Sequence, residues 1–205
     1  MPTEPPPPAV AGILLAAGMS TRMGANKLLL EIDGEAVVRR AAERALAAGL
    51  APLLVVVGHE AERVRAALAG LPCRFSLNAD YASGIASSVR AGVGALPGEV
   101  AAAAIVLADM PFVTTAMLAA LIERYRATAA PLVVSAYEGV NAPPMLYDRS
   151  LFGELATIPA GTPARQVVRR HLESAEILAW PAAALADLDV PEDFARLAAA
   201  FAESR

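Results

Sequence analysis

The sequence predicts a three-layer α/β domain with a mostly parallel sheet, and two patterns lead to that prediction. Short apolar runs alternate along the 205-residue chain with longer amphipathic segments, which is typical of folds whose parallel strands are connected by helices. Several of the apolar runs contain no polar residue, as expected for strands that are covered on both faces. A length of 205 residues fits one domain with a substantial core.

Six apolar runs are expected to be strands, at residues 10–16, 52–57, 74–77, 103–108, 132–137 and 177–180. Amphipathic spacing and end signals such as glycine predict helices at residues 35–48, 60–69, 85–94, 115–128, 150–156, 163–173 and 191–203. Thr114 or Thr115 is a suitable cap for the fourth of these helices. We expect residues 28–32 to be a brief extended piece, and residues 138–144, with their proline pair, to be a loop.

Composition and charge exclude several classes of protein. The formal net charge is −4 and the charges of both signs are interleaved, so we expect neither a nucleic-acid-binding nor a membrane-binding face. No apolar run reaches the roughly 18 residues of a membrane-spanning helix. The proline run in residues 1–8 lacks the features of a secretory signal and predicts a disordered tail before a domain at 9–205. Because Cys73 is the single cysteine, no intramolecular disulfide can form, and we expect a cytoplasmic location.

The most informative stretch is the loop after the first strand, LLAAGMSTRMGANK at residues 14–27. Its glycines, hydroxyls and cations include Gly18, Ser20, Arg22 and Lys27. Such a loop offers backbone N–H groups and positive charge to one point, which is what a polyphosphate requires. The spacing fits neither the dinucleotide-binding pattern G-x-G-x-x-G nor the P-loop. On these residues alone, a simple turn is an equal alternative.

Two further segments are expected at the same edge of the sheet. Asp109 follows the strand at 103–108, and the polar loop at 78–84 follows the strand at 74–77. Ligands of open α/β sheets bind at the carboxyl ends of the strands, so these segments and the glycine loop should converge on one site. A carboxylate such as that of Asp109 is a hard oxygen ligand of the kind that Mg²⁺ prefers, although an Asp before Pro111 can also simply begin a turn.

The glycine-rich stretch resembles the signature LAAGxSxRMGxxK of small nucleotidyltransferases that activate cofactors and sugars. The resemblance is strongest to the MobA-like branch that transfers a nucleotide onto molybdopterin, the molybdenum cofactor cytidylyltransferases and guanylyltransferases. It implies a Rossmann-like domain of the nucleotide-diphospho-sugar transferase type and Mg²⁺-dependent transfer with release of pyrophosphate. It also implies catalytic roles for Lys27, Arg22 and Asp109.

The same resemblance assigns binding residues. It implies that the nucleotide is bound by Leu15, Ala16, Ala17, Gly18, Ser20, Arg22, Lys27, Asn78, Asp80, Gly84 and Ser88. In the family a DMP tripeptide holds the metal ion, and this chain has it at 109–111. The family motif DxDTPED, here DLDVPED at 187–193, makes Asp189 the second expected metal ligand, with Asp187 behind it. Acids at that position can also cap the helix that follows.

Residues 16–18, Ala-Ala-Gly, resemble the cytidine-using branch, because guanine-using relatives have two glycines there. A methyl group narrows the base pocket, which favours CTP. The implied acceptor residues are Asn141, Pro143 and Arg165, but the chain departs from the family in both acceptor segments. It has VNAPP at 140–144 instead of a Gly-His-Pro or Gly-Asn-Pro turn, and AGTPAR at 160–165 instead of Gly-Asp-x-Gly-Ala-Arg. Molybdopterin is the implied acceptor, and another phosphorylated acceptor remains open.

Other functions remain as alternatives. One is a guanylyltransferase or another transferase that uses a nucleoside triphosphate and a different phosphorylated acceptor. A second is a nucleotide-binding chaperone without catalysis, which delivers a cofactor to a molybdoenzyme partner. A third is an oxidoreductase with a bound dinucleotide, which the missing G-x-G-x-x-G and the presence of Gly58, rather than an acid, after the second long strand disfavour.

Overall fold

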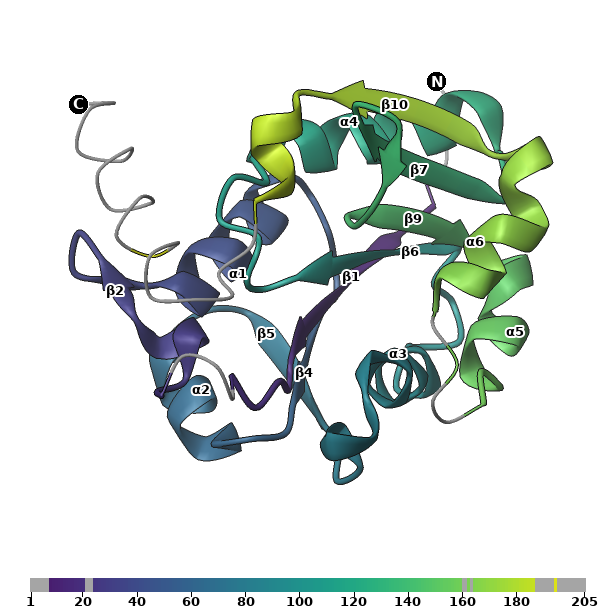
Figure 1. Cartoon of the computed structure of the whole chain (residues 1–205). Coiled ribbons are helices and arrows are strands. Elements are labelled where there is room, and N and C mark those ends of the chain that lie inside the picture. The colour runs from purple at the N-terminus through teal and green to yellow at the C-terminus, as the bar shows by residue number, and fades with distance from the viewer. Residues whose placement is uncertain (1–7, 21–23, 160–161, 163, 187–193, 195–205) are drawn as a thin grey trace, which may run out of the picture.

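The computed structural model describes residues 8–20, 24–159, 162, 164–186 and 194 of the chain. These residues form a single α/β domain in which helices cover both faces of a central sheet, as Figure 1 shows. The predicted fold class is confirmed. Apart from Pro8 and Phe194, the predicted tail at 1–8 and the predicted helix at 191–203 lie outside the described residues. Within the described residues, no helix has the length and apolar character that crossing a membrane requires.

The central sheet contains eight strands in the part of the chain that the structure describes. Along the sheet they follow in the order β10 (Glu176–Trp180), β7 (Leu132–Tyr137), β9 (Met145–Asp148), β6 (Ala102–Leu107), β1 (Val10–Ala16), β4 (Leu53–Val57) and β5 (Cys73–Leu77). The eighth, β8 (Val140–Asn141), pairs with β7. Parallel pairing joins β6, β1, β4 and β5, and also β7 and β10, whereas β9 is antiparallel to both of its neighbours.

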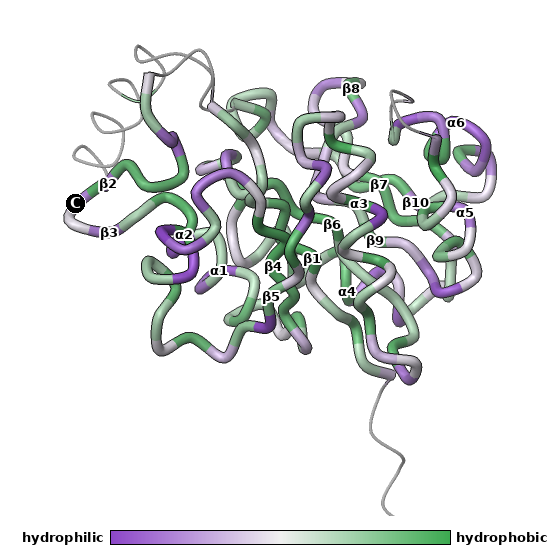
Figure 2. Tube along the Cα trace, turned by 90° about the horizontal axis from the view of Figure 1, so that it is seen from below, coloured by the Kyte–Doolittle hydropathy of each residue, from purple (hydrophilic) through white to green (hydrophobic). Residues whose placement is uncertain are grey.

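Two layers of helices enclose this sheet. One face is covered by α1 (Val37–Ala47), α2 (Ala61–Ala67) and α4 (Thr115–Thr128), and the other by α3 (Ile85–Gly94), α5 (Phe152–Ala156) and α6 (Arg165–His171). Each layer forms its own apolar cluster with the sheet, because successive strand residues point to opposite faces. Figure 2 shows that the central strands are the most hydrophobic part of the chain trace.

Strand β1 lies at the centre of the sheet, and all seven of its residues are buried. Leu14 packs in the cluster under α1 and α4, whereas Ile13 and Leu15 pack in the cluster under α3. Because the strand has no face in contact with water, its sequence is a continuous apolar run, and that run made it predictable. All six predicted strands are present, each within one residue of its predicted ends.

The prediction was wrong around residues 28–36. Residues 28–29, expected to be extended, belong to a short 3₁₀ helix, Lys27–Leu29. Residues 35–36, expected to begin a helix, form β3 (Glu35–Ala36), which pairs with β2 (Glu31–Ile32), and α1 begins only at Val37. Asp33 and Gly34 between the two strands have φ angles of 55° and 76°. A tight two-residue hairpin turn requires these left-handed conformations. Because this turn forms, the residues on either side of it pair as strands and residues 35–36 do not begin the helix.

The prediction also missed two short antiparallel strands. The expected loop at 138–144 contains β8, and β9 follows it without any predicted counterpart. Glu138 and Gly139, with φ angles of 48° and 87°, form the turn between β7 and β8. The Ser135 hydroxyl donates to the carbonyl of Pro144 at 2.6 Å, which holds the end of the hairpin against β7.

The predicted helices within the described residues are present, and one predicted cap is confirmed. The Thr114 hydroxyl accepts the N–H of Met117 at 3.2 Å and thereby caps α4. The two later helices are shorter than expected because part of each is 3₁₀ helix, at Arg149–Leu151 before α5 and at Leu172–Ser174 after α6.

Gly92 is the point at which α3 comes closest to the sheet. A Cβ atom there would lie 2.5 Å from Ile13 Cγ2 and 3.1 Å from Val56 Cγ2. Gly92→Ala should therefore lower the free energy of unfolding, measured by urea denaturation, by about 1–3 kcal/mol. The control is Gly94→Ala in the same helix, where a Cβ would meet nothing within 4 Å, and this change should keep or raise stability. Equal stability of the two variants would contradict the close packing of α3.

Cys73 lies half-buried on β5, at one edge of the sheet. Burial raises the pKa of its thiol, while the Arg39 guanidinium acts in the opposite direction. A raised pKa leaves less thiolate at a given pH, and thiolate is the form that reacts. Below that pKa, iodoacetamide should modify the folded chain several-fold more slowly than the urea-unfolded chain, and the midpoint of the pH–rate profile should be higher. Intact-protein mass spectrometry measures both rates, and equal midpoints would refute the shift.

Candidate functional site

The candidate site forms where β1 and β6 end side by side. In their parallel register Leu15 pairs with Leu107, and the N–H of Ala108 donates to the carbonyl of Leu15 at 3.2 Å. Beyond β1 the chain enters the loop with Gly18, and beyond β6 it reaches Asp109. Both segments leave the carboxyl edge of the sheet at adjacent points, which is where open α/β sheets bind ligands.

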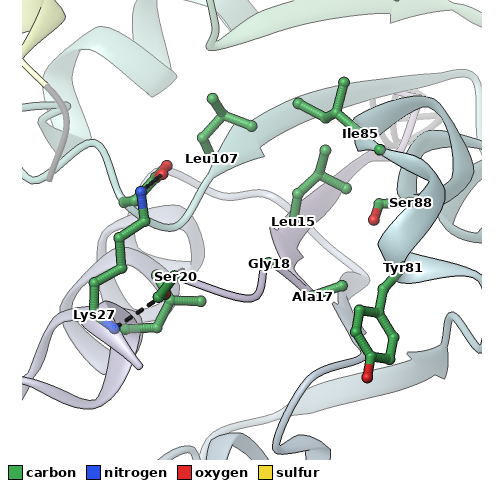
Figure 3. A pocket seen from close by; sticks show the side chains of 12 residues that line it. Leu15, Ala17, Gly18, Ser20, Lys27, Tyr81, Ile85, Ser88 and Leu107 are labelled. Carbon is green, nitrogen blue, oxygen red and sulfur yellow. Dashed lines mark hydrogen bonds and ion pairs between the residues drawn. The ribbon is translucent and has the colours of Figure 1, made fainter. Parts of the chain in front are cut away.

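A cavity of about 230 Å³ lies at this edge. Its lining includes the following residues that the sequence had singled out: Leu15, Ala17, Gly18, Ser20, Lys27, Gly84, Ser88 and Asp109. Four further residues line it, namely Leu28, Tyr81, Ile85 and Leu107. Figure 3 shows that the cavity has a charged end, with Ser20 and Lys27, and an apolar part formed by Leu15, Ile85 and Leu107.

The charged end contains an ion pair between Lys27 and Asp109. Nζ of Lys27 lies 2.6 Å from Oδ2 of Asp109, and the two side chains are 13% and 23% exposed. Partial burial reduces the screening of such a pair by water and salt. A carboxylate and an ammonium held together in a cleft are suited to a metal–polyphosphate complex, because the carboxylate can bind the cation and the ammonium can bind a phosphate.

The loop that carries Lys27 is held by its own polar groups. The backbone N–H of Lys27 donates to the Ser20 hydroxyl at 3.1 Å, and Asn26 caps the 3₁₀ helix in which Lys27 is the first residue. Ser20 and Gly24 have φ angles of 51° and 69°, and these left-handed conformations turn the chain sharply. The loop therefore brings Lys27 back to the sheet edge, next to Asp109.

A second set of contacts fixes the segment that carries Asp109. Arg44, from α1, donates through Nη1 to the carbonyl oxygens of Pro111 and Val113, the latter at 3.1 Å. Met110 is buried in the core cluster under α1 and α4. The residue after Asp109 is thus anchored in the core, while the carboxylate of Asp109 stays at the cavity.

The segment after β5 forms the opposite wall. The buried Asn78 amide donates to the hydroxyls of Ser87 and Ser88, at 2.8 and 3.0 Å, and its oxygen accepts the N–H of Asp80 at 3.0 Å. These bonds tie the loop after β5 to the first turn of α3. Neither Asn78, which is buried, nor Asp80, which is exposed, lines the cavity, and of this group only Ser88 does.

Gly58, directly after β4, allows this wall to approach the glycine loop. A Cβ atom on Gly58 would lie 2.7 Å from Cβ of Tyr81 and 2.9 Å from Cβ of Ala17. Glycine permits a close approach that any other residue would prevent. The Ala17 methyl group and Tyr81 therefore lie next to each other in the cavity lining, as Figure 3 shows, and the methyl group takes up room at this end of the cavity.

Ala16 was predicted at the nucleotide, but its side chain points away from the cavity. It is buried in the cluster under α1 and α4, whereas Leu15 and Ala17, on either side of it, belong to the opposite cluster. The remaining predicted residues of the charged end lie outside the described residues, and they are Arg22, Asp187 and Asp189. Among the described residues, no group of three or more His, Cys, Asp or Glu side chains could together hold a metal ion.

The predicted acceptor residues lie at a second cavity of about 300 Å³. Asn141, Pro143 and Arg165 contribute to its lining, and it shares three apolar side chains with the first cavity, namely those of Leu15, Ile85 and Leu107. The structure thus brings the two predicted groups of residues to adjoining cavities. Of the three shared apolar residues, Leu15 was predicted, whereas Ile85 and Leu107 were not, because their sequence pattern is that of an ordinary core.

A glycine-rich loop, a lysine and an aspartate at the carboxyl edge of the sheet are typical of α/β domains that bind nucleotides. Comparison with known proteins identifies the family. The chain belongs to the MobA-like NTP transferase domain family, whose model matches residues 12–175. The resemblance seen in the sequence is thereby confirmed at the level of the family.

Two relatives illustrate the range of proteins that the chain resembles. The bifunctional protein GlmU of Anaeromyxobacter sp. (strain Fw109-5) is 35% identical over 179 residues, which cover 83% of this chain and 34% of GlmU. Nicotine blue oxidoreductase of Paenarthrobacter nicotinovorans is 30% identical over 172 residues, which cover 80% of this chain and 83% of that protein. The chain therefore spans about a third of the length of the GlmU relatives that it matches.

Solved structures agree with the family. Rv0371c from Mycobacterium tuberculosis H37Rv matches with a TM-score of 0.81 and 28% identity, covering 94% of this chain and 99% of Rv0371c. A structure of Rv0371c in complex with manganese matches with a TM-score of 0.77 and 27% identity over 93% and 98% of the two chains. These matches support the predicted type of fold over almost the whole chain.

Proposed function

We propose that the protein is a nucleotidyltransferase that moves CMP from CTP, in a Mg²⁺-dependent reaction, onto a phosphorylated acceptor and releases pyrophosphate. The observation that carries the proposal is the pairing of Lys27 with Asp109 at 2.6 Å in a cavity that the glycine loop borders. This arrangement provides a cation for phosphate and a carboxylate for a metal at one point. The MobA-like family of the chain supports the same reaction type.

The reaction is an in-line displacement at the α-phosphorus. A phosphate oxygen of the acceptor forms a bond to the α-phosphorus while the bond from that phosphorus to the bridging oxygen breaks, and pyrophosphate leaves with the electron pair. An acceptor phosphate is already ionised near neutral pH, so no general base is required. Lys27 would neutralise charge at the α-phosphate, and Arg22 with the N–H groups of the loop would hold the β- and γ-phosphates.

The donor chemistry of the site fits a hard divalent cation. Asp109, anchored through Met110 and Arg44, offers carboxylate oxygens at the cavity. We assign it as one metal ligand and Asp189 as the second, with Asp187 as the alternative. Bound Mg²⁺ would supply charge neutralisation and orientation of the phosphates. The manganese complex of Rv0371c shows that a structural relative binds a divalent cation.

The preference for CTP rests on the narrow end of the cavity. The Ala17 methyl group and Tyr81 approach Gly58 so closely that a Cβ at Gly58 would lie within 2.9 Å of both. A pyrimidine needs less room than a purine, so this wall favours CTP over GTP. In this assignment Gly18 and Gly84 border the base and ribose, and Asn78 acts by holding Ser88 in place.

Molybdopterin is the acceptor that the family resemblance suggests, with Asn141, Pro143 and Arg165 facing it and a molybdoenzyme as the receiving partner. Transfer of GMP, transfer to another phosphorylated acceptor, and cofactor delivery without catalysis are the alternatives within this family. Oxidoreduction is a second candidate function because one relative is named nicotine blue oxidoreductase. The absence of the G-x-G-x-x-G pattern in the sequence disfavours it.

Asp109→Asn should abolish most of the activity if the carboxylate holds the metal. With Mg²⁺, molybdopterin and each of the four nucleoside triphosphates in turn, we expect pyrophosphate release with CTP from the natural chain. In Asp109→Asn the rate should fall by on the order of 10²-fold or more. Glu123→Gln, an exposed change on α4, is the control and should keep the rate.

The outcomes of this assay separate the candidates. Release with GTP alone would keep the reaction type and overturn the choice of base. CTP binding without turnover would indicate another acceptor or a delivery role. A nicotinamide cofactor that is oxidised or reduced with a small-molecule substrate would support oxidoreduction, and no nucleotide binding at all would refute the proposal.

Ala17→Gly tests the choice of base directly. Removal of the methyl group widens the narrow end of the cavity, so the ratio of kcat/KM for CTP to that for GTP should fall by about tenfold, the effect expected of one methyl-sized contact in a pocket. The control is Ala16→Gly, the neighbouring change on the opposite face of the sheet, which should leave that ratio as it is. An unchanged ratio in Ala17→Gly would show that this wall does not select the base.

A further inference from the structure

The second cavity adjoins the nucleotide cavity on the face of the sheet that α3 and α6 cover. The two cavities share Leu15, Ile85 and Leu107, so they are continuous at the carboxyl ends of β1 and β6. We call the second cavity the side chamber. Its volume of about 300 Å³ lies within the range of cavities that enclose small organic ligands.

The walls of the side chamber are mainly apolar. Val89 of α3, Ile105 of β6, Met145 of β9 and Val168 of α6 line it, and each is at most 5% exposed. Such walls stabilise an apolar ligand surface, because they remove it from water. The thioether of Met145 is in addition a favourable contact for an aromatic ring.

Ile85 marks the junction between the two cavities. It contributes to the lining of both, and 47% of it is exposed although it is a large apolar residue. In Figure 3 its side chain lies across the cavity from Lys27. Exposed apolar surface that continues into an apolar cavity is typical of ligand-binding surfaces.

Tyr147 brings one polar atom to the enclosed part of the side chamber. The residue is 4% exposed, and its hydroxyl donates to Sδ of Met145 at 3.6 Å, a weak acceptor. Among the described residues, the hydroxyl has no nitrogen or oxygen partner. Burial raises the pKa of this phenol, so it stays protonated at neutral pH. It can therefore exchange the sulfur contact for a stronger hydrogen bond to a ligand.

Two cations of α6 complete the lining. Arg165 and Arg169 are exposed, and because they are four residues apart they lie on one side of the helix. In the described ranges neither has an ion-pair partner. They give this side of the molecule a local positive charge that attracts an anionic ligand.

We propose that the side chamber encloses the body of the acceptor, and that the acceptor is a phosphomonoester of a compact aromatic molecule with one hydrogen-bonding group directed at the Tyr147 hydroxyl. The proposal rests on the proposed nucleotidyl transfer and names its substrate class. The acceptor phosphate extends past Ile85 to Lys27 and Asp109, where it attacks the α-phosphorus as described above.

The first experiment compares two phosphomonoesters by calorimetric titration of the full chain. Naphthyl phosphate has a compact aromatic body, and ribose phosphate has a polar body of smaller apolar area. We expect naphthyl phosphate to bind at least about tenfold more tightly. Ile85→Ala should weaken naphthyl phosphate binding by about fivefold, since part of the apolar contact is lost. The matched control is Ile177→Ala on the edge strand β10, an isoleucine that is 50% exposed and does not line the side chamber.

The second experiment tests the hydroxyl of Tyr147. Quinolinyl phosphate differs from naphthyl phosphate by a ring nitrogen that can accept a hydrogen bond. The natural chain should prefer a quinoline isomer whose nitrogen reaches the hydroxyl, and Tyr147→Phe should abolish that preference, a change of about fivefold to tenfold in the ratio of affinities. Tyr125→Phe, which removes a hydroxyl that donates to Asp148 instead, is the control and should keep the ratio.

CTP titrations with the same preparations separate this proposal from the proposed function. Two outcomes overturn the acceptor class and leave nucleotidyl transfer intact. In one, the chain binds CTP but does not prefer naphthyl phosphate to ribose phosphate. In the other, the preference for naphthyl phosphate survives in Ile85→Ala. Naphthyl phosphate binding without CTP binding overturns the proposed function and with it the acceptor role of the side chamber. Pyrophosphate release from CTP with an aromatic phosphomonoester, and not with ribose phosphate, supports both.

Discussion

The parallel pairing of β1 with β6 is the interaction on which the site depends. All residues of β1 are buried, and its register with β6, from Val10 opposite Ala102 to Leu15 opposite Leu107, is fixed by apolar side chains on both faces. A slip by two residues would keep the faces but displace Asp109 by about 7 Å along the sheet. The 2.6 Å contact with Lys27 would then be lost. The packing of the core therefore determines where Lys27 and Asp109 meet, and the loops supply these side chains.

How much of the fold the sequence predicts depends on where the pairing partners lie. Buried strands such as β1 and β4 are continuous apolar runs between glycine or proline signals, so the chain pattern alone locates them. β9 has four residues, and it separates β6 from β7, its predecessors in sequence. β9 reaches this place because the chain folds back after β7 and β8 and pairs between β7 and β6. No local sequence pattern specifies this pairing. Glu35 and Ala36 likewise have helical spacing, but the turn at Asp33 and Gly34 places them in a strand.

The candidate site was predictable mainly for residues that belong to recognisable motifs. Asp109 comes two residues after β6, and Lys27 ends the glycine-rich stretch that begins in β1, so their meeting at the sheet edge could be inferred. A motif names consecutive residues, whereas a strand sends every second side chain to the opposite face, so the Ala16 side chain lies in the core and only its backbone could contact a nucleotide. Ile85 and Tyr147 gave no signal, since an apolar or aromatic residue at the wall of a cavity has the same pattern as one in a filled core.

The two cavities differ in how freely their residues can change. The nucleotide cavity rests on β1, β4 and β6, where Gly58 lies too close to its neighbours to accept a side chain and the Asn78 amide is fully bonded. The side chamber is bordered by the β7–β8 hairpin and by α6, where Asn141 and Arg165 are exposed. Substitutions at exposed positions cost little stability, so the acceptor side can vary while the nucleotide side is retained.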